Sequence, residues 1–178
     1  MEHMLKRGGP RTAVATFVPA VDTTFGRWQR VEGYVTFTEL GARPGVRVRF
    51  QLSGFAPGAV HAVHVHEFGD LRDGCDSLGG HFNPTGDAHG SIWVPEHGRH
   101  AGDLINNLRA NHKGEVVFEY EDPMLSIDGP HGVIGRSVVI HQGVDDLGLG
   151  GYSDSKTTGH AGGRMACAVI GLAASTDL

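Results

Sequence analysis

The sequence predicts an all-β fold: an eight-stranded antiparallel Greek-key β-sandwich or flattened barrel with two long functional loops. The first observation is a set of short runs in which apolar and polar residues alternate with period 2, bounded by Gly, Pro, Asp or Asn. The second is that no window of eleven or more residues keeps a helical period. The third is the glycine content, 28 of 178 residues without a Gly-X-Y repeat, which is typical of many turns between short strands.

Each predicted strand is justified by its own alternation. In order along the chain, the eight strands are expected at residues 13–18, 31–37, 46–52, 59–67, 103–109, 115–120, 137–141 and 164–172. The run 59–67 is the most informative, because valines and histidines alternate in it and therefore point to opposite faces. Residues 155–158 are the one place where a helical turn is expected.

The connections between these strands indicate where function lies. Loops longer than about 15 residues are uncommon in compact domains and usually carry function, and two occur here, at 68–102 and 142–163. A third connection, 122–136, is expected to be a Greek-key crossover. The length of 178 residues suits one domain, so we expect residues 12–178 to form a single domain after a mobile tail at 1–11.

Composition and charge exclude several classes of partner. The net charge is −5 and the basic residues are scattered, which argues against nucleic acid as a ligand. No apolar run is long enough to span a membrane. The first ten residues lack the apolar stretch of a secretory signal, so a cytoplasmic location is the expectation. In that compartment Cys75 and Cys167, taken alone, favour two separate reduced thiols.

Twelve histidines are the unusual feature of the composition. His64 and His66 lie two residues apart on a predicted strand, so both imidazoles share one face while Val63 and Val65 face the other way. Such a face is a platform for a metal ion. Taken alone, however, the pair is more often two surface histidines on an exposed strand.

Further potential ligands lie at strand ends and in the first long loop, where folding can bring them to one region. They are His81 and His89 in the loop, His100 and Asp103 at its end, and His141 at the end of strand 137–141. Imidazole nitrogen suits copper and zinc, and a carboxylate completes a tetrahedral zinc site. Seven such residues exceed the needs of one ion and fit two ions with a shared ligand.

These residues stand in motifs that resemble those of the copper-zinc superoxide dismutase family over roughly residues 12–173. The motifs are His64-Val-His66, Gly80-His81-Phe-Asn-Pro84, His89-Gly90, Arg99-His100-Ala-Gly-Asp103, Gly135-Arg136-Ser-Val-Val-Ile-His141, Asp145-Asp146-Leu-Gly148 and Gly163-Arg164-Met-Ala-Cys167. They are ordered, correctly spaced and mutually dependent. The resemblance implies the same β-sandwich fold that the alternation predicts.

The resemblance also implies a metal site. Copper would be held by His64, His66, His81 and His141, and zinc by His81, His89, His100 and Asp103. His81 would then be an imidazolate that bridges both ions, a form that two divalent cations favour.

The reaction implied is the disproportionation of superoxide to dioxygen and hydrogen peroxide, as copper alternates between Cu(II) and Cu(I). Arg164 would receive the anionic substrate, and His81 would take part in proton transfer. Asp145 matches a carboxylate of the family that would link His66 to His89 by hydrogen bonds. Cys75 and Cys167 match an intrasubunit disulfide, which replaces the expectation of reduced thiols.

Three questions stay open at the level of sequence. His97 is an alternative zinc ligand, although only His100 stands in the Arg-His-x-Gly-Asp pattern. Trp28, in an unusually long stretch at 18–32, is either core cover or an interface residue. The role of Trp93, in an extended spacing between His89 and His100, is also undecided.

Alternative functions and partners follow from the same resemblance. A copper chaperone with a dismutase-like domain would carry additional Cys-x-x-Cys and Cys-x-Cys motifs, which this sequence lacks. A catalytically silent metal-binding module would not need Arg164 and His141. A homodimer is expected because Gly69, Ile134 and Leu172 match interface positions of the family, and a copper chaperone is an expected partner in metal loading.

Overall fold

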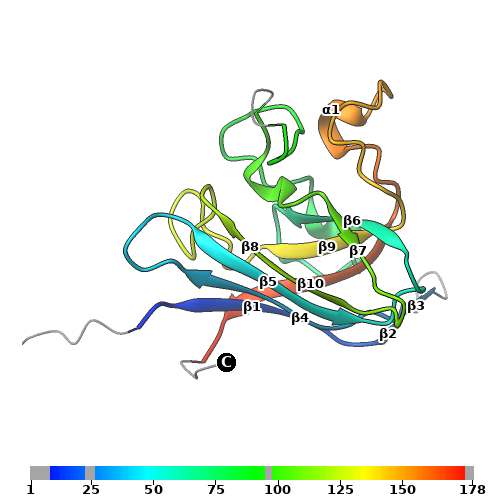
Figure 1. Ribbon diagram of the computed structural model, residues 1–178, viewed down its shortest axis with the longest axis horizontal. Coiled ribbons are helices and arrows are strands. Elements are labelled where there is room, and N and C mark those ends of the chain that lie inside the picture. Colours follow the sequence, from blue (N-terminus) through cyan, green and yellow to red (C-terminus); the bar gives the residue numbers. More distant parts are fainter. Residues whose placement is uncertain (1–8, 23–26, 95–97, 175–178) are drawn as a thin grey trace, which may run out of the picture.

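The structure is a computed structural model that describes residues 9–22, 27–94 and 98–174. Its strands are β1 (Thr12–Phe17), β2 (Ala20–Asp22), β3 (Arg27–Gln29), β4 (Glu32–Glu39), β5 (Val46–Ser53), β6 (Val60–His66), β7 (Asn107–Arg109), β8 (Val116–Asp122), β9 (Ser137–His141) and β10 (Arg164–Leu172). The helical turns are η1 (Asp76–Leu78), η3 (Ala101–Asp103) and α1 (Ser155–Thr158). The two long loops rise together on one side of the sheet (Figure 1).

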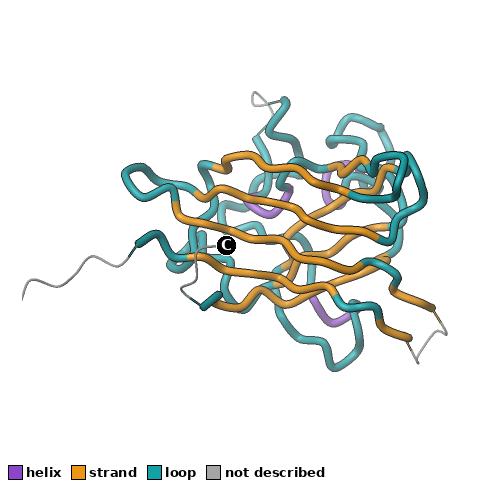
Figure 2. Tube along the Cα trace, turned by 60° about the horizontal axis from the view of Figure 1, so that its bottom comes forward, coloured by secondary structure: helices purple, strands orange, loops and turns teal. Residues whose placement is uncertain are grey.

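Eight of the strands form one antiparallel sheet that curls into a nearly closed barrel, which confirms the predicted fold class (Figure 2). Their order is β7-β6-β9-β10-β1-β4-β5-β8, so β7 and β8 are the two ends of the sheet. The connection from β8 to β9 crosses from one half of the barrel to the other, which is the predicted Greek-key crossover.

Burial along the strands explains why the site forms where it does. In β5 the buried residues Val46, Val48, Phe50 and Leu52 alternate with more exposed ones, as expected when one face contacts the core and the other solvent. By contrast, every residue of β9 is buried. The long loops cover the outer face of β6 and β9 (Figure 1), so polar side chains on that face are enclosed.

Two local predictions need correction. The strand expected at 103–109 is only Asn107–Arg109, because η3 ends at Asp103 and Leu104 and Asn106 adopt positive φ angles of 50° and 62°. The Asp103 carboxylate accepts the backbone N–H of His100 at 2.9 Å, which turns the chain before the strand begins. The hairpin of β2 and β3 was not predicted, whereas the helical turn at 155–158 was.

The ends of the chain are only partly described. Of the expected tail at 1–11, residues 1–8 lie outside the described residues. Arg11 is anchored, since its guanidinium forms ion pairs with Glu39 and Asp128. None of the helices described is both long and apolar enough to cross a lipid bilayer.

Candidate metal centre

Four imidazoles converge on the outer face of β6 and β9. His64 and His66 come from β6, and His141 ends β9 beside them. His81 joins them because it forms an isolated antiparallel bridge with His66, supported by the hydrogen bond from Phe82 N to Val65 O at 2.8 Å. One ring nitrogen from each imidazole lies within 4.8 Å of the others.

Hydrogen bonds fix which nitrogen of each ring faces this cluster. The Nδ1–H of His66 donates to Gly79 O at 3.0 Å, and that of His141 donates to Gly162 O at 3.1 Å, so Nε2 of both rings is free to bind. These two Nε2 atoms are 3.3 Å apart. His64 is turned the other way round, with Nε2 bound to a carboxylate and Nδ1 facing the cluster.

A second cluster shares His81 with the first. Asp103 Oδ1 lies 2.9 Å from His81 Nδ1, 2.9 Å from His89 Nδ1 and 3.0 Å from His100 Nδ1. The other oxygen, Oδ2, accepts the N–H groups of Gly90 and His100, which holds the carboxylate in place. All four ligand atoms lie within 4.8 Å of one another.

The donor atoms fit two metal ions. A tetrahedral ion with bonds of about 2.1 Å separates its ligand atoms by about 3.4 Å, close to the spacings of both clusters. Moreover, His64 Nδ1 and His81 Nε2 are buried without any hydrogen-bond partner, a costly situation that an ion between them would relieve. Four imidazoles suit copper, and three imidazoles with one carboxylate suit zinc.

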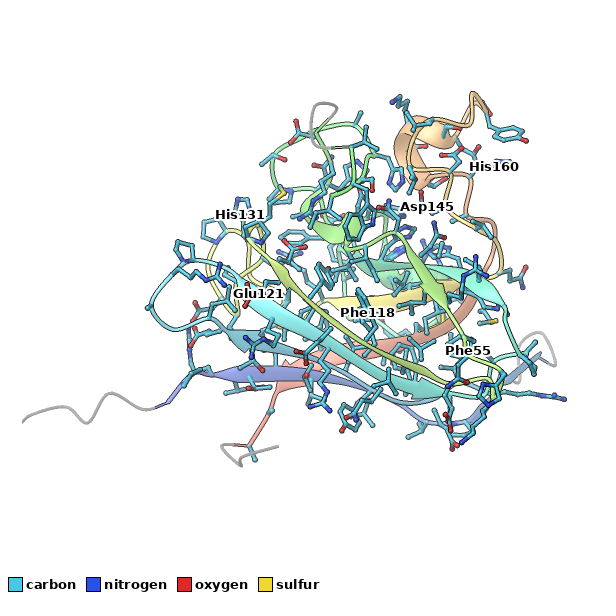
Figure 3. All side chains as sticks on the ribbon, viewed as in Figure 1. Phe55, Phe118, Glu121, His131, Asp145 and His160 are labelled. Carbon is cyan, nitrogen blue, oxygen red and sulfur yellow. A yellow bond between two sulfur atoms is a disulfide. The ribbon has the colours of Figure 1, made fainter. Side chains whose placement is uncertain are left out.

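The carboxylate of Asp145 links the two clusters, but not through the histidine we expected. Its Oδ2 accepts the Nε2–H of His64 at 2.6 Å and its Oδ1 accepts that of His89 at 3.0 Å. The expected partner His66 is wrong, because its Nδ1 is occupied by Gly79 and its Nε2 faces His141. Asp145 belongs to the second long loop and lies on the side of the sheet where the two long loops rise (Figure 3).

Electrostatics divide the site into a neutral half and a charged half. Burial, reinforced by the nearby His81, lowers the pKa of His66 to about 2; burial likewise lowers that of His141 to about 4, so both rings offer a lone pair at neutral pH. Burial opposes protonation of His89 too, yet the Asp103 and Asp145 carboxylates raise its pKa to about 9. A divalent ion would replace that proton as the positive charge between the two acids.

Arg164 lies beside the copper-type cluster at the start of β10. It pairs in register with His141, and its guanidinium donates to Cys75 O and Gly79 O. These carbonyls belong to the loop that carries His81, so the same contacts fix both the guanidinium and the loop. Cys75 is joined to Cys167 by a disulfide, which confirms the pairing that the family resemblance implied.

Some site residues carry no signal in the sequence. Asn106 donates from its amide to Gly90 O at 2.8 Å and to Asp145 Oδ2 at 3.2 Å. Gly159 has φ +64°, and a Cβ there would lie 2.5 Å from both the Asp145 carboxylate and His89 Nε2, so only glycine fits. Neither residue belongs to a ligand pattern.

Two of the open sequence questions fall outside the part of the chain that the structure describes. His97 lies outside the described residues, as does the side chain of Trp28, whereas His100 reaches Asp103 as stated above. Trp93 is 64% exposed.

The fold and these clusters define a class of protein: a β-barrel with two adjacent metal sites that share one histidine. Comparison with known proteins agrees. The family described as copper/zinc superoxide dismutase (SODC) matches residues 31–170. The chain therefore belongs to the copper/zinc superoxide dismutase family, whose metals are copper and zinc and whose members are oxidoreductases acting on superoxide.

Two individual proteins support the assignment. "Extracellular superoxide dismutase [Cu-Zn]" of Drosophila melanogaster is 49% identical over 144 residues, covering 80% of this chain and 77% of the relative. A crystal structure of the clock protein EA4 superposes with a TM-score of 0.80 at 36% identity, covering 97% of this chain and 100% of the other.

The first of these comparisons contradicts the expected cytoplasmic location. The Drosophila relative is an extracellular enzyme by name.

Proposed function

We propose that this chain disproportionates superoxide at the two clusters described above, with copper bound by His64, His66, His81 and His141 and zinc bound by His81, His89, His100 and Asp103. The observation that carries the proposal is the position of His81. Its Nδ1 lies against Asp103 in one cluster, while its buried Nε2 faces the other without a partner.

Copper, when bound, supplies one-electron redox chemistry, in which one superoxide gives up an electron and leaves as dioxygen and a second gains that electron and leaves, with two protons, as hydrogen peroxide. His81 Nε2 is the atom of the chain that can take up a proton and return it to the reduced product. The neutral rings of His66 and His141 can bind copper without competing with His81 for that proton, because burial keeps their pKa values low.

Arg164 is the residue that binds and orients the substrate. Backbone carbonyls hold part of its guanidinium, and its remaining N–H groups can donate to a small anion. The Arg164 charge also contributes to the low pKa values of His66 and His141, which places it within electrostatic reach of both. The net charge of −5 is therefore less relevant than the local field at the site.

The test combines metal analysis with superoxide consumption on the purified protein. The wild type should bind one copper and one zinc and be active. His141→Ala should lose copper and activity, and Arg164→Ala should retain both metals but react more slowly, with a weaker salt dependence. Arg72→Gln, an exposed arginine paired with Asp70, is the matched control. A copper-loaded wild type without activity would overturn the proposal, and an Arg164→Ala protein at full rate at low salt would overturn the steering role.

We further propose that residues 12–178 form one domain that assembles into a homodimer. Phe68, Ile134 and Leu172, together the interface patch, are 50%, 40% and 66% exposed. Gly69 and Gly135 join the patch, since a Cβ on Gly69 would lie 2.5 Å from Gly135 O. Ile134→Glu should reduce the sedimentation coefficient to that of a monomer, whereas Val144→Glu, outside the patch, should not. Monomeric wild type at micromolar concentration would contradict this.

Two proposals concern the cellular setting. The extracellular relative supports an extracellular location, and recovery of the protein only from cell lysate, never from medium, would contradict it. Complete burial of the His64 side chain supports copper delivery by a chaperone. Equal loading from free copper and from a copper-carrying donor protein at matched concentration would contradict that.

A further inference from the structure

The barrel has an open seam between its end strands. β7 and β8 follow one another in the chain, and the hydrogen bond from Asn111 N to Glu115 O at 2.8 Å closes the turn between them. Beyond that turn no backbone hydrogen bond joins the two strands in the part of the chain that the structure describes. Between them lies a hollow of about 250 Å³, here called the seam groove.

The floor of the seam groove is apolar. Phe118 stands opposite Phe50 in the sheet register, so it points to the inner face of the barrel, yet it is 41% exposed while Phe50 is fully buried. Figure 3 labels Phe118 on β8. The six apolar residues that line the groove are Trp93, Ile105, Leu108, Val116, Val117 and Phe118. Phe118 therefore leaves apolar surface in the groove that the barrel core does not cover.

One cation stands at the rim. Arg109 lines the groove at the end nearest the turn, next to the buried Leu108. No carboxylate among the described residues forms an ion pair with it, whereas Arg11, Arg43 and Arg47 all have such partners. The amide of Asn107, the other polar residue in the lining, is bound to the backbone of Asp145 on both sides. Arg109 is therefore the polar group in the groove that has a charge to offer a ligand.

We propose that the seam groove binds a small amphipathic carboxylate, such as a medium-chain fatty acid. An apolar chain of about ten carbons fits a hollow of this size, with its tail over Phe118 and Trp93. The carboxylate lies at the opposite end, where the Arg109 guanidinium accommodates it through paired N–H donors. The site lies outside the metal clusters and does not use their ligands.

The experiment is calorimetric titration of the metal-loaded full-length protein with decanoate, decanol and decylamine. Decanoate should bind at one site per chain, and decanol and decylamine at least about tenfold more weakly because neither pairs with Arg109. Arg109→Gln should weaken decanoate binding by a similar factor, while Arg30→Gln, an exposed arginine that does not line the groove, should leave it unchanged. Superoxide consumption should be equal in both variants.

Several results would overturn the proposal: no decanoate binding to the wild type at millimolar concentration, equal affinities for decanoate and decanol, or equal effects of the two arginine variants. Phe118→Ser and Trp93→Ala provide a second check, since both should weaken binding several-fold; unchanged affinity in both would place the ligand elsewhere. Sedimentation of the Phe118→Ser variant tests whether a second copy of the chain, instead of a carboxylate ligand, occupies the groove. If this variant lost self-association that the wild type shows, the groove would be a contact with a second copy of the chain, and the ligand proposal would be wrong.

Discussion

Removal of the disulfide should have one of the largest effects on stability of any change outside the ligands. Cys75 and Cys167 are separated by 92 residues, so their bond restricts more than half of the unfolded chain. Loop-closure entropy for a loop of this length corresponds to about 4.6 kcal/mol at 25 °C. Since small proteins are stable by about 5–15 kcal/mol, the Cys75→Ser/Cys167→Ser variant should lose a large part of its unfolding free energy.

Urea unfolding of the metal-free protein measures this effect, because bound metals would add their own binding free energy. The midpoint should fall by about 2–3 M if the slope is about 2 kcal/mol per molar urea. The control is wild-type protein kept reduced, and its urea midpoint should be close to that of the double variant. A loss below about 1 kcal/mol would refute the entropic reasoning, and a reduced wild type much more stable than the variant would show that the serines themselves disturb packing.

Three other changes should be measurable. Asp145→Asn should weaken zinc binding by about 10–100-fold, because an amide cannot accept both ring N–H groups; unchanged affinity in a chelator competition would contradict this. Arg99→Gln should lower the free energy of unfolding by about 3–5 kcal/mol, since it leaves the buried carboxylate of Asp122, which Arg99 contacts at 2.7 Å, without its ion-pair partner. The exposed control Arg43→Gln should lower it by less than about 1 kcal/mol. Metal-free stability should be greatest near pH 6.5. As the pH falls below 6.5, stability decreases because His141 is protonated in the unfolded chain but stays neutral in the folded protein until about pH 4. As the pH rises above 6.5, stability decreases because folded His89, whose pKa is about 9, loses the proton that stabilises the fold. A flat profile between pH 4 and 9 would contradict the assigned pKa values.

The shared position of His64 and His66 in one cluster could be predicted because it depends on local periodicity. Alternation in 59–67 places His64 and His66 on one face whatever the rest of the chain does. The direction of each ring, however, depends on distant partners. Asp145 approaches from a loop 81 residues from His64, and alternation alone does not tell which of the two histidines it reaches.

The zinc half shows a different limit of the sequence. Residues 103–109 alternate as a strand does, but ligand geometry overrides the pattern, because Asp103 must turn inward and Leu104 and Asn106 then take positive φ angles. The seam groove also escaped prediction. It results from strands that fail to pair, and nothing in the residues of β7 or β8 distinguishes an unpaired edge from a paired one.

The attachment of His81 has a consequence for the order in which the site assembles. His81 is bonded to the sheet through the bridge with His66, as are the other three copper-type ligands through β6 and β9, whereas His89 and His100 are held by loop segments. A barrel that has folded without metals therefore already carries one nearly complete coordination shell. We expect the other to form only when the rest of its loop closes, so binding of zinc should be coupled to ordering of that segment more strongly than binding of copper. Partial metallation would then yield two distinct species: one with a closed loop and an empty redox position, the other redox-competent but with the loop unlocked.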